Sequence, residues 1–276
     1  MEGKNIIHML KNASSIQMES FVIEEAGGSL LVVDGGMKAD ADHLLEKLRE
    51  ISGKAVPHVT AWFFTHAHLD HMDAFLELFA REPVPVTFDR IYCCFPSEQY
   101  LALEQDPNGG ASTLKRFNRQ LDRLGSRVVT VSAGDEYVFG TARVEILRTV
   151  DCTIQENVVN NSSIVFKLYL GEKTMLFLGD LGLEGGAALL AQKREALKAD
   201  YCQMAHHGQH GVDEEFYRAV APEACFWCAP DWLWDNDAGE GFNTSIFATV
   251  ETRGWMEKLG VRTHYVIKDG DHAVWC

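Results

Sequence analysis

The segment FFTHAHLDHMDAF, residues 63–75, places three histidines and two aspartates within eight positions, directly after a run of apolar residues. Residues two apart in an extended segment point to the same side, so His66 and His68 can present both imidazoles to one metal ion. Asp70 stands where the N-cap of the following helix is expected and His71 opens that helix, so this pair can bind a second ion. A chance group of polar loop residues is the alternative, but this combination should arise in roughly one chain in a few hundred. The spacing therefore favours a metal site.

The ligand types indicate the chemistry of such a site. Imidazoles and carboxylates without a thiolate suit zinc, and iron and manganese are also compatible. Two divalent ions roughly 3.5–4 Å apart would share a water, lower its pKa toward neutrality and polarise a carbonyl or phosphoryl oxygen. Hydrolysis is therefore the first hypothesis.

The elements that must position these residues follow from the hydrophobic patterns. Short apolar runs rich in β-branched and aromatic residues predict strands at 29–36, 59–66, 90–95, 127–135, 141–150, 162–170 and 174–180. Apolar residues at helical spacing predict helices at 40–51, 71–80, 111–125, 184–198 and 244–260. The segments 162–170 and 174–180 are expected to form a hairpin, and 262–275 a final strand. Two series of strands, each followed by helices, indicate two packed sheets with helices outside, in one domain over residues 1–276.

The composition limits the partners and the compartment. The formal net charge is −15, from 40 acidic and 25 basic residues, so the mean field repels polyanions and nucleic acid is not an expected partner. Seven cysteines form an odd count without a disulfide framework, which indicates reduced thiols. Because no signal-peptide core and no apolar stretch of about 18 residues occurs, we expect a cytoplasmic protein that does not enter a membrane.

The pattern H-x-H-x-D-H, formed by residues 66–71 behind an apolar strand, resembles the signature of the metallo-β-lactamase superfamily. Other landmarks of that family occur in the expected order along the chain. They are Asp34 in LVVDGG, Asp180 in TMLFLGD, and the histidines of QMAHHGQHG. The resemblance extends from about residue 20 to about residue 212. It implies a four-layer αββα sandwich with the metal site at one edge, where the two sheets meet. The NNSS and HHG segments are most similar to the branch with the ComEC competence proteins and the phosphorylcholine esterases.

The resemblance also implies the ligands of two metal ions. The first ion would take His66, His68 and Asp180, and the second would take Asp70, His71, Asp180 and one histidine of the pair at 206–207. Neighbours in an extended segment point opposite ways, so only one of this pair is expected to be a direct ligand. His206 is preferred because it is the first residue past the strand YCQMA, and His207 would then face the substrate or support a ligand.

One position departs from the family pattern. A further histidine normally precedes the strand that leads to the bridging aspartate, whereas this sequence has Asn160 and Asn161 there. An amide oxygen or a water would have to complete the first metal position. Asp34 has two interpretations, as a turn residue and as the hydrogen-bond acceptor of a ligand imidazole, and the two are compatible.

The resemblance places the reaction on the hydrolytic side of the family, because members with di-iron redox centres tend to have Glu where His68 stands. Asp70 or His207 would handle the proton, and the substrate would be a small ester, either a phosphodiester or phosphoester or else a lactone or thioester. Lys115, Arg116, Arg119 and Arg123 form a basic helix face that either steers a phosphate or is simply solvated. The loop with Trp232 and Trp234 is either a lid or part of the surface.

Two other functions compete with this hypothesis. A ComEC-like nuclease acting on single-stranded DNA is favoured by the NNSS and HHG segments and disfavoured by the negative charge. The other is a non-catalytic scaffold that binds one metal or a ligand, because Asn160 and Asn161 replace a histidine.

Overall fold

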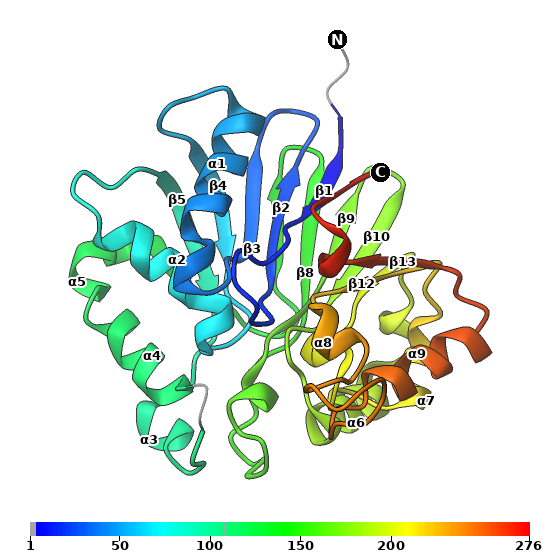
Figure 1. Ribbon diagram of the computed structural model, residues 1–276. Helices are drawn as coiled ribbons and strands as arrows, with labels where there is room; N and C mark the ends of the chain where they lie inside the picture. Colours follow the sequence, from blue (N-terminus) through cyan, green and yellow to red (C-terminus); the bar gives the residue numbers. More distant parts are fainter. Residues whose placement is uncertain (1–3, 107–108) are drawn as a thin grey trace.

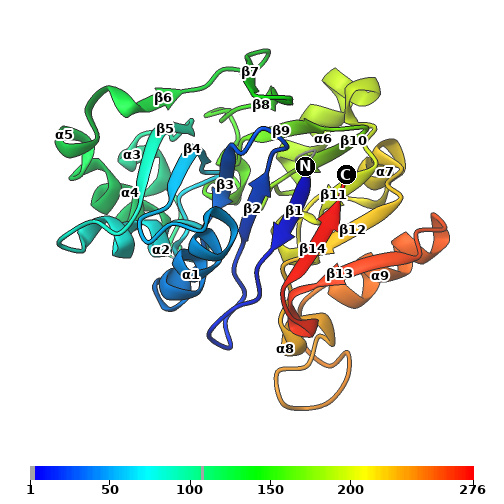
Figure 2. The same cartoon turned by 90° about the horizontal axis from the view of Figure 1, so that it is seen from above.

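The computed structural model describes residues 4–106 and 109–276 and contains two mixed seven-stranded sheets (Figures 1 and 2). The first sheet consists of, in spatial order, β14 (His272–Trp275), β1 (Ile6–Met9), β2 (Ser20–Glu24), β3 (Leu30–Asp34), β4 (His58–Phe63), β5 (Thr87–Cys93) and β6 (Val128–Thr130). The second consists of β13 (Thr263–Val266), β12 (Ala224–Trp227), β11 (Tyr201–Gln203), β10 (Lys173–Phe177), β9 (Val165–Leu170), β8 (Ala142–Arg148) and β7 (Glu136–Phe139). The predicted αββα sandwich is confirmed.

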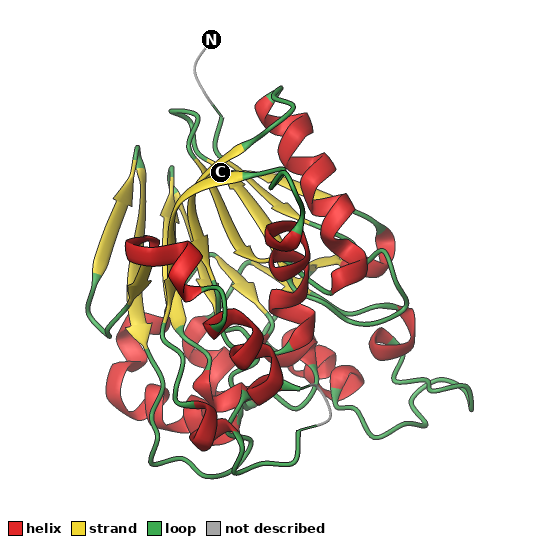
Figure 3. Cartoon of the chain, turned by 90° about the vertical axis from the view of Figure 1, so that its left-hand side faces the viewer, coloured by secondary structure: helices red, strands yellow, loops and turns green. Residues whose placement is uncertain are grey.

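Helices lie outside the two sheets (Figure 3). Along the first half of the chain they are α1 (Ala41–Ser52), α2 (Leu69–Ala80), α3 (Glu98–Leu101), α4 (Gly110–Asn118) and α5 (Leu121–Leu124). Along the second half they are α6 (Leu183–Lys193), α7 (Glu214–Val220), α8 (Asp231–Trp234) and α9 (Thr249–Lys258). Short 3-10 turns are η1 (Lys38–Asp40), η2 (Gly125–Arg127), η3 (Asn160–Ser162), η4 (Arg194–Leu197), η5 (Ala205–Gly208) and η6 (Ile267–Asp269). Among the described residues, no helix has the length and apolar character needed to cross a membrane.

Three hydrophobic cores hold the four layers together, and β4 shows how alternation along one strand serves two of them. Trp62 packs against Phe75 of α2 in the core between the first sheet and its helices. Phe63, on the opposite face, stacks on Phe166 at 5.1 Å between centroids in the core between the sheets. Because successive side chains of a strand point to opposite faces, a strand buried on both faces requires apolar residues at consecutive positions. The third core lies between the second sheet and its helices.

The end of the chain differs from the prediction of one strand over 262–275. The turn η6 and Gly270, whose φ is 119°, redirect the backbone, so β13 stays in the second sheet and β14 crosses to the first. There β14 pairs antiparallel with β1, with Ile6 opposite Trp275. The strands β1, β2, β7 and β12 were not predicted, and each has only four or five residues. The hairpin of β9 and β10 is confirmed.

Parallel pairing fixes where the polar loops emerge. β3 and β4 are parallel, and so are β10 and β11. The carboxyl ends of parallel neighbours lie at the same edge of a sheet, so the segments after β3 and β4 meet at one edge and those after β10 and β11 at another. These four segments carry the residues that the sequence singles out for metal binding.

A buried C-x-x-C spacing, overlooked in the sequence analysis, begins in β12 with Cys225 and ends just after it with Cys228. Cys225 packs into the core under the helices, whereas Cys228 packs into the core between the sheets. The two thiols therefore lie on opposite faces of the second sheet, and both cysteines are free. The spacing is structural here and forms neither a disulfide nor a metal site.

Asp271 fastens the crossing segment to the first sheet's helical layer. Its Oδ1 accepts hydrogen bonds from the backbone N of Lys11 at 3.0 Å and from Nε2 of His43 at 2.8 Å. Burial opposes ionisation of Asp271, but the bonds from His43 and Lys11 outweigh it and lower the pKa to about 2. The same bond raises the pKa of His43.

We therefore expect Asp271→Asn to destabilise the protein by about 1 kcal/mol at pH 5.5, where Asp271 is ionised and His43 is protonated. The raised pKa of His43 makes its contribution present at low pH, and this part is lost as the pH rises through the folded-state pKa. Urea unfolding at pH 5.5 and pH 9 should show the smaller cost at pH 9. Asp269→Asn, in the same loop and paired only with its neighbour Lys268, is the control. Equal costs at the two pH values would contradict the assignment.

Candidate metal centre

The predicted histidine segment folds into the turn between β4 and α2. Thr65 fixes it, since its backbone N and Oγ1 donate to the carboxylate of Asp34 at 2.8 and 2.6 Å. The rings of His66 and His68 converge, with Nε2 of the first 2.9 Å from Nδ1 of the second. His68, not Asp70, is the N-cap of α2, so Asp70 and His71 lie in the first helical turn.

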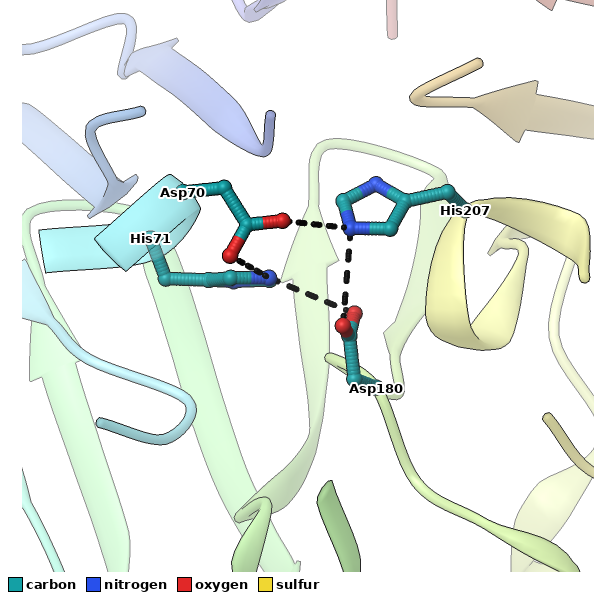
Figure 4. Close-up of side chains that lie close together, drawn as sticks. All are labelled: Asp70, His71, Asp180 and His207. Atoms are coloured by element: carbon teal, nitrogen blue, oxygen red, sulfur yellow. Dashed lines mark hydrogen bonds and ion pairs between the residues drawn. The ribbon is translucent and has the colours of Figure 1, made fainter. Parts of the chain in front are cut away.

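Two groups of ligand atoms result, and Asp180 belongs to both. The first group is His66, His68 and Asp180, and the second is Asp70, His71, Asp180 and His207; within each group the ligand atoms lie within 4.8 Å of one another. Figure 4 shows the second group, with side chains from α2, the loop after β10 and the turn η5 pointing toward one another. All of these side chains are buried.

Distances within the second group match the needs of one ion. Asp180 Oδ1 lies 3.3 Å from Nε2 of His71, and Asp180 Oδ2 lies 3.4 Å from Nε2 of His207. Two ligands at about 2.0–2.1 Å from a tetrahedral zinc are about 3.3–3.4 Å apart. In the first group, Nε2 of His66 lies 3.8 Å from Asp180 Oδ2 and needs a small contraction.

The structure places His207, and not the expected His206, in the second group. Both residues are left-handed, with φ of 51° and 57°, so the expectation for an extended pair does not apply. His207 is fully buried in the second group, and its Nδ1 lies 3.1 Å from the backbone O of Cys228. His206 lies at the edge of the centre with a side chain 15% exposed, 3.8 Å from Asp180 Oδ2.

Other buried groups hold the ligands in place. Asp34 combines both predicted roles: it has a left-handed φ of 55° at the end of β3, and its Oδ2 lies 2.7 Å from Nδ1 of His71. Asp106 was not anticipated, and its Oδ2 lies 3.1 Å from Nε2 of His68. Ser163 Oγ accepts from the backbone N of Asp180 at 3.1 Å. Imidazole ligands commonly use their second nitrogen for such carboxylate contacts.

The two asparagines have different surroundings. Asn161 Oδ1 accepts from the backbone N of Gly182 and of Gly185, so this residue anchors the start of α6 rather than a metal. Asn160 lies at the centre, with its Nδ2 3.5 Å from Nε2 of His206.

The charges of the centre are strongly coupled. Burial lowers the pKa of His71, but Asp180, Asp34 and Asp70 outweigh it and raise that pKa well above its usual value. Burial likewise favours a neutral Asp180, but His207, His71 and His206 outweigh it and hold its pKa well below the usual range. At the first group, burial lowers the pKa of His66 well below its usual value, which keeps this imidazole neutral.

Glu19 is a site residue that the sequence analysis missed. It is fully buried just before β2, and neither carboxylate oxygen has a hydrogen-bond partner among the described residues. It forms a further group with Asp34 and His71. Burial raises its pKa well above the usual value, and the nearby Asp34 adds to this effect. A charged residue directly ahead of the apolar run SFVI was the available signal.

The two surfaces that the sequence suggested for substrate contact, the basic helix face and the tryptophan loop, make contacts within the protein. In the basic face, Arg116 binds Asp73 of α2, and Arg123 lies 4.4 Å above the ring of Phe79, so these two residues hold α4 and α5 to α2. Trp232 donates to the backbone O of Ser15 at 2.7 Å. Trp234 packs edge-on against Trp227, with 5.3 Å between centroids. These contacts favour the surface interpretation of the tryptophan loop.

Comparison with known proteins gives a family match over most of the chain. The family model of the metallo-beta-lactamase superfamily matches residues 19–222. No protein of curated function matches the sequence significantly.

Three solved structures illustrate the similarity of fold. The metallo-beta-lactamase fold protein YhfI from Bacillus subtilis is 10% identical with a TM-score of 0.56, and the alignment covers 99% of this chain and 100% of YhfI. A diphosphatase from the PhnP family is 11% identical with a TM-score of 0.51, over 99% and 98% of the two chains. CmlA, a diiron β-hydroxylase from Streptomyces venezuelae, is 12% identical with a TM-score of 0.58, but this chain spans only 55% of it. At these identities the similarity concerns the fold alone.

The contact of Asp34 with His71 yields a test of the second group. Asp34→Asn keeps the shape and tolerates the left-handed backbone but removes the negative charge behind the imidazole. We expect the affinity of the second group for zinc to fall by about 10–100-fold, as measured by competition with a chromophoric chelator. Asp200→Asn is the matched control, because Asp200 also accepts from the N and Oγ1 of a threonine, Thr174, away from the centre. An unchanged affinity in Asp34→Asn would refute this role.

Proposed function

The chain belongs to the metallo-beta-lactamase superfamily, and from this premise we propose that it is a metal-dependent hydrolase of a small ester, with phosphodiesters and phosphoesters as the favoured class. The observation that carries the proposal is the position of Asp180, whose carboxylate belongs to both groups of ligand atoms. A shared carboxylate of this kind suits two adjacent cations. Dinuclear centres of this type catalyse in-line displacement in phosphatases and nucleases.

The residues fit two divalent ions on three counts. The donors are imidazole nitrogens and carboxylate oxygens, which suit zinc and also iron or manganese. They are buried, where an uncompensated polar atom costs about 1–3 kcal/mol. Nε2 of His71 and Oδ1 of Asp180 make no hydrogen bond within the described residues, and both face the interior of the second group. A cation between them would satisfy both atoms.

When bound, two such ions supply Lewis acidity that activates water and polarises the scissile ester. The residues of this chain then have distinct tasks. Asp34 and Asp106 orient His71 and His68 through the nitrogens that face away from the centre. His207 is held by the backbone O of Cys228, which leaves its Nε2 directed at Asp70 and Asp180.

Proton handling falls to Asp70 in this proposal. Its Oδ2 lies 3.1 Å from Nε2 of His207, and its Oδ1 lies 3.9 Å from Nε2 of His71. Burial opposes ionisation of Asp70, but His71 and His207 outweigh it and lower its pKa, so the carboxylate is the dominant form. An ionised carboxylate beside the ions can accept a proton from water and return it to the leaving oxygen.

The proposal predicts about two equivalents of zinc per wild-type chain purified without chelator, measured by plasma mass spectrometry. Asp180→Ala should retain less than one, since it removes a ligand from both groups. His58→Ala is the control, because His58 is an exposed imidazole at the opposite end of β4. No metal in the wild type, or two equivalents retained in Asp180→Ala, would refute the shared centre.

We further expect the zinc-loaded wild type to hydrolyse bis(p-nitrophenyl) phosphate faster than p-nitrophenyl acetate or a γ-lactone. Asp70→Asn should lower kcat for the phosphodiester at least about 100-fold, since proton transfer contributes about 10²–10⁴-fold and a ligand is also perturbed. Metal content is measured on the same samples. Asp89→Asn, at an exposed position of β5, is the control. Faster turnover of a lactone or carboxylic ester would redirect the substrate class, and no turnover together with tight ligand binding would support a scaffold.

A further inference from the structure

We propose, on the basis of the hydrolase function above, that His206 supplies the third imidazole of the first metal position. The adjacent residues His206 and His207 would then bind one ion each. This assignment would give each position four protein ligands, with Asp180 shared. Without His206, the first group has three ligand atoms and the second has four.

The backbone of the histidine pair is the first reason for this assignment. His206 and His207 have φ of 51° and 57°, and Gly208 follows with φ of 85°. A non-glycine residue in this conformation is strained, because its Cβ lies too close to the following carbonyl oxygen. Contacts with the surrounding structure maintain this strained backbone. His206 N donates to the backbone O of Gly179 at 3.0 Å, and a Cβ on Gly208 would collide with the ring of Trp227. Strained residues held in this way concentrate at functional sites.

The consequence of this backbone is that both rings face one carboxylate. In an extended pair, one side chain would point away. Here Nε2 of His206 lies 3.8 Å from Asp180 Oδ2, while Nε2 of His207 lies 3.4 Å from the same oxygen. The ring centroids are 6.1 Å apart, so the two imidazoles approach Asp180 from different directions. Two directions of approach suit two ions better than one.

The distance of His206 is the second reason. Nε2 of His66, a member of the first group, also lies 3.8 Å from Asp180 Oδ2. Both imidazoles therefore need the same small contraction to reach the roughly 3.3–3.4 Å that separates two ligands of a tetrahedral zinc. His206 lies just outside the compact first group in the structure, and its side chain is 15% exposed.

Asn160 is the competing ligand for the first metal position. Its Nδ2 donates to Oδ1 of Asn157 at 2.9 Å, and the same nitrogen is 3.5 Å from Nε2 of His206. Its Oδ1, the atom through which an amide would bind a cation, is buried and makes no hydrogen bond within the described residues. We prefer His206 because imidazole is a common zinc ligand and both rings of the histidine pair face Asp180.

The test counts tightly bound zinc ions in His206→Asn, His207→Asn and the double variant, by chelator competition and mass spectrometry. Asparagine tolerates the left-handed backbone, so the imidazole is removed without new strain. If each histidine serves a different ion, each single variant keeps one tight ion, loses affinity for the other at least about tenfold, and the double variant keeps neither. His210→Asn is the control on the same loop, because Nε2 of His210 lies 2.9 Å from the backbone O of Ile246, outside both groups.

The outcomes separate this inference from the function on which it rests. A wild-type chain that binds no divalent ion overturns both. A wild type with two ions and an unchanged affinity in His206→Asn overturns only the assignment of His206. Loss of the first ion in Asn160→Ala but not in His206→Asn would assign that position to the amide instead.

A second variant covers the case in which His206→Asn fails to fold. His206→Gly suits the left-handed backbone and leaves a partly exposed space where the ring was. Millimolar imidazole should restore its zinc affinity toward the wild-type value while leaving the thermal midpoint of the metal-free chain unchanged. No restoration by imidazole in a folded His206→Gly chain would count against a ligand role.

Discussion

The buried carboxylate of Asp180 is the interaction on which the rest of the centre depends. Its side chain is 2% exposed and has four imidazoles within 3.3–3.8 Å, those of His66, His71, His206 and His207. A carboxylate in such a place is costly unless positive charge surrounds it. Among these four, His71 and His207 provide that charge, and this is why the pKa values of both are raised while that of Asp180 is lowered. A pair of cations would take over the same task.

The sandwich assembles this arrangement from segments that are remote in sequence. Each sheet changes from antiparallel to parallel pairing partway across, and the site segments follow parallel strands of the two sheets. The aromatic stack of Phe63, Phe166 and Phe177 in the core between the sheets joins the strand before the histidine segment to the strands around Asp180. Ligand distances are therefore set by packing between the sheets, which is close to crystalline density and yields little.

The predictability of each feature follows the range of the interactions that fix it. The spacing of residues 66–71 is local, so the sequence indicates the grouping of His66 with His68 and of Asp70 with His71, and the structure brings these pairs together. The conformation of the pair at 206–207 depends on contacts with Gly179 and Trp227, which no local pattern shows, so the assumption of an extended pair favoured His206 where the structure places His207. Glu19 and Asp106 were missed for the same reason, since each joins the centre only through tertiary contact. The division of the last predicted strand between the two sheets likewise depends on the turn at Gly270. Glycine adopts many backbone conformations, so its presence in the sequence does not predict this turn.

Strain and metal binding are coupled in such a centre. Two left-handed histidines cost roughly 2–4 kcal/mol together, and the three cores of the sandwich maintain them before any ligand is bound. An ion present at a thousand times its dissociation constant stabilises the folded chain by about 4.1 kcal/mol, which is of the same size. In such a centre the fold holds the ligand side chains in position before an ion binds. The free energy of ion binding then offsets the strain of the two histidines. Preorganisation of this kind would allow side chains from opposite sheets to meet one ion with only small shifts.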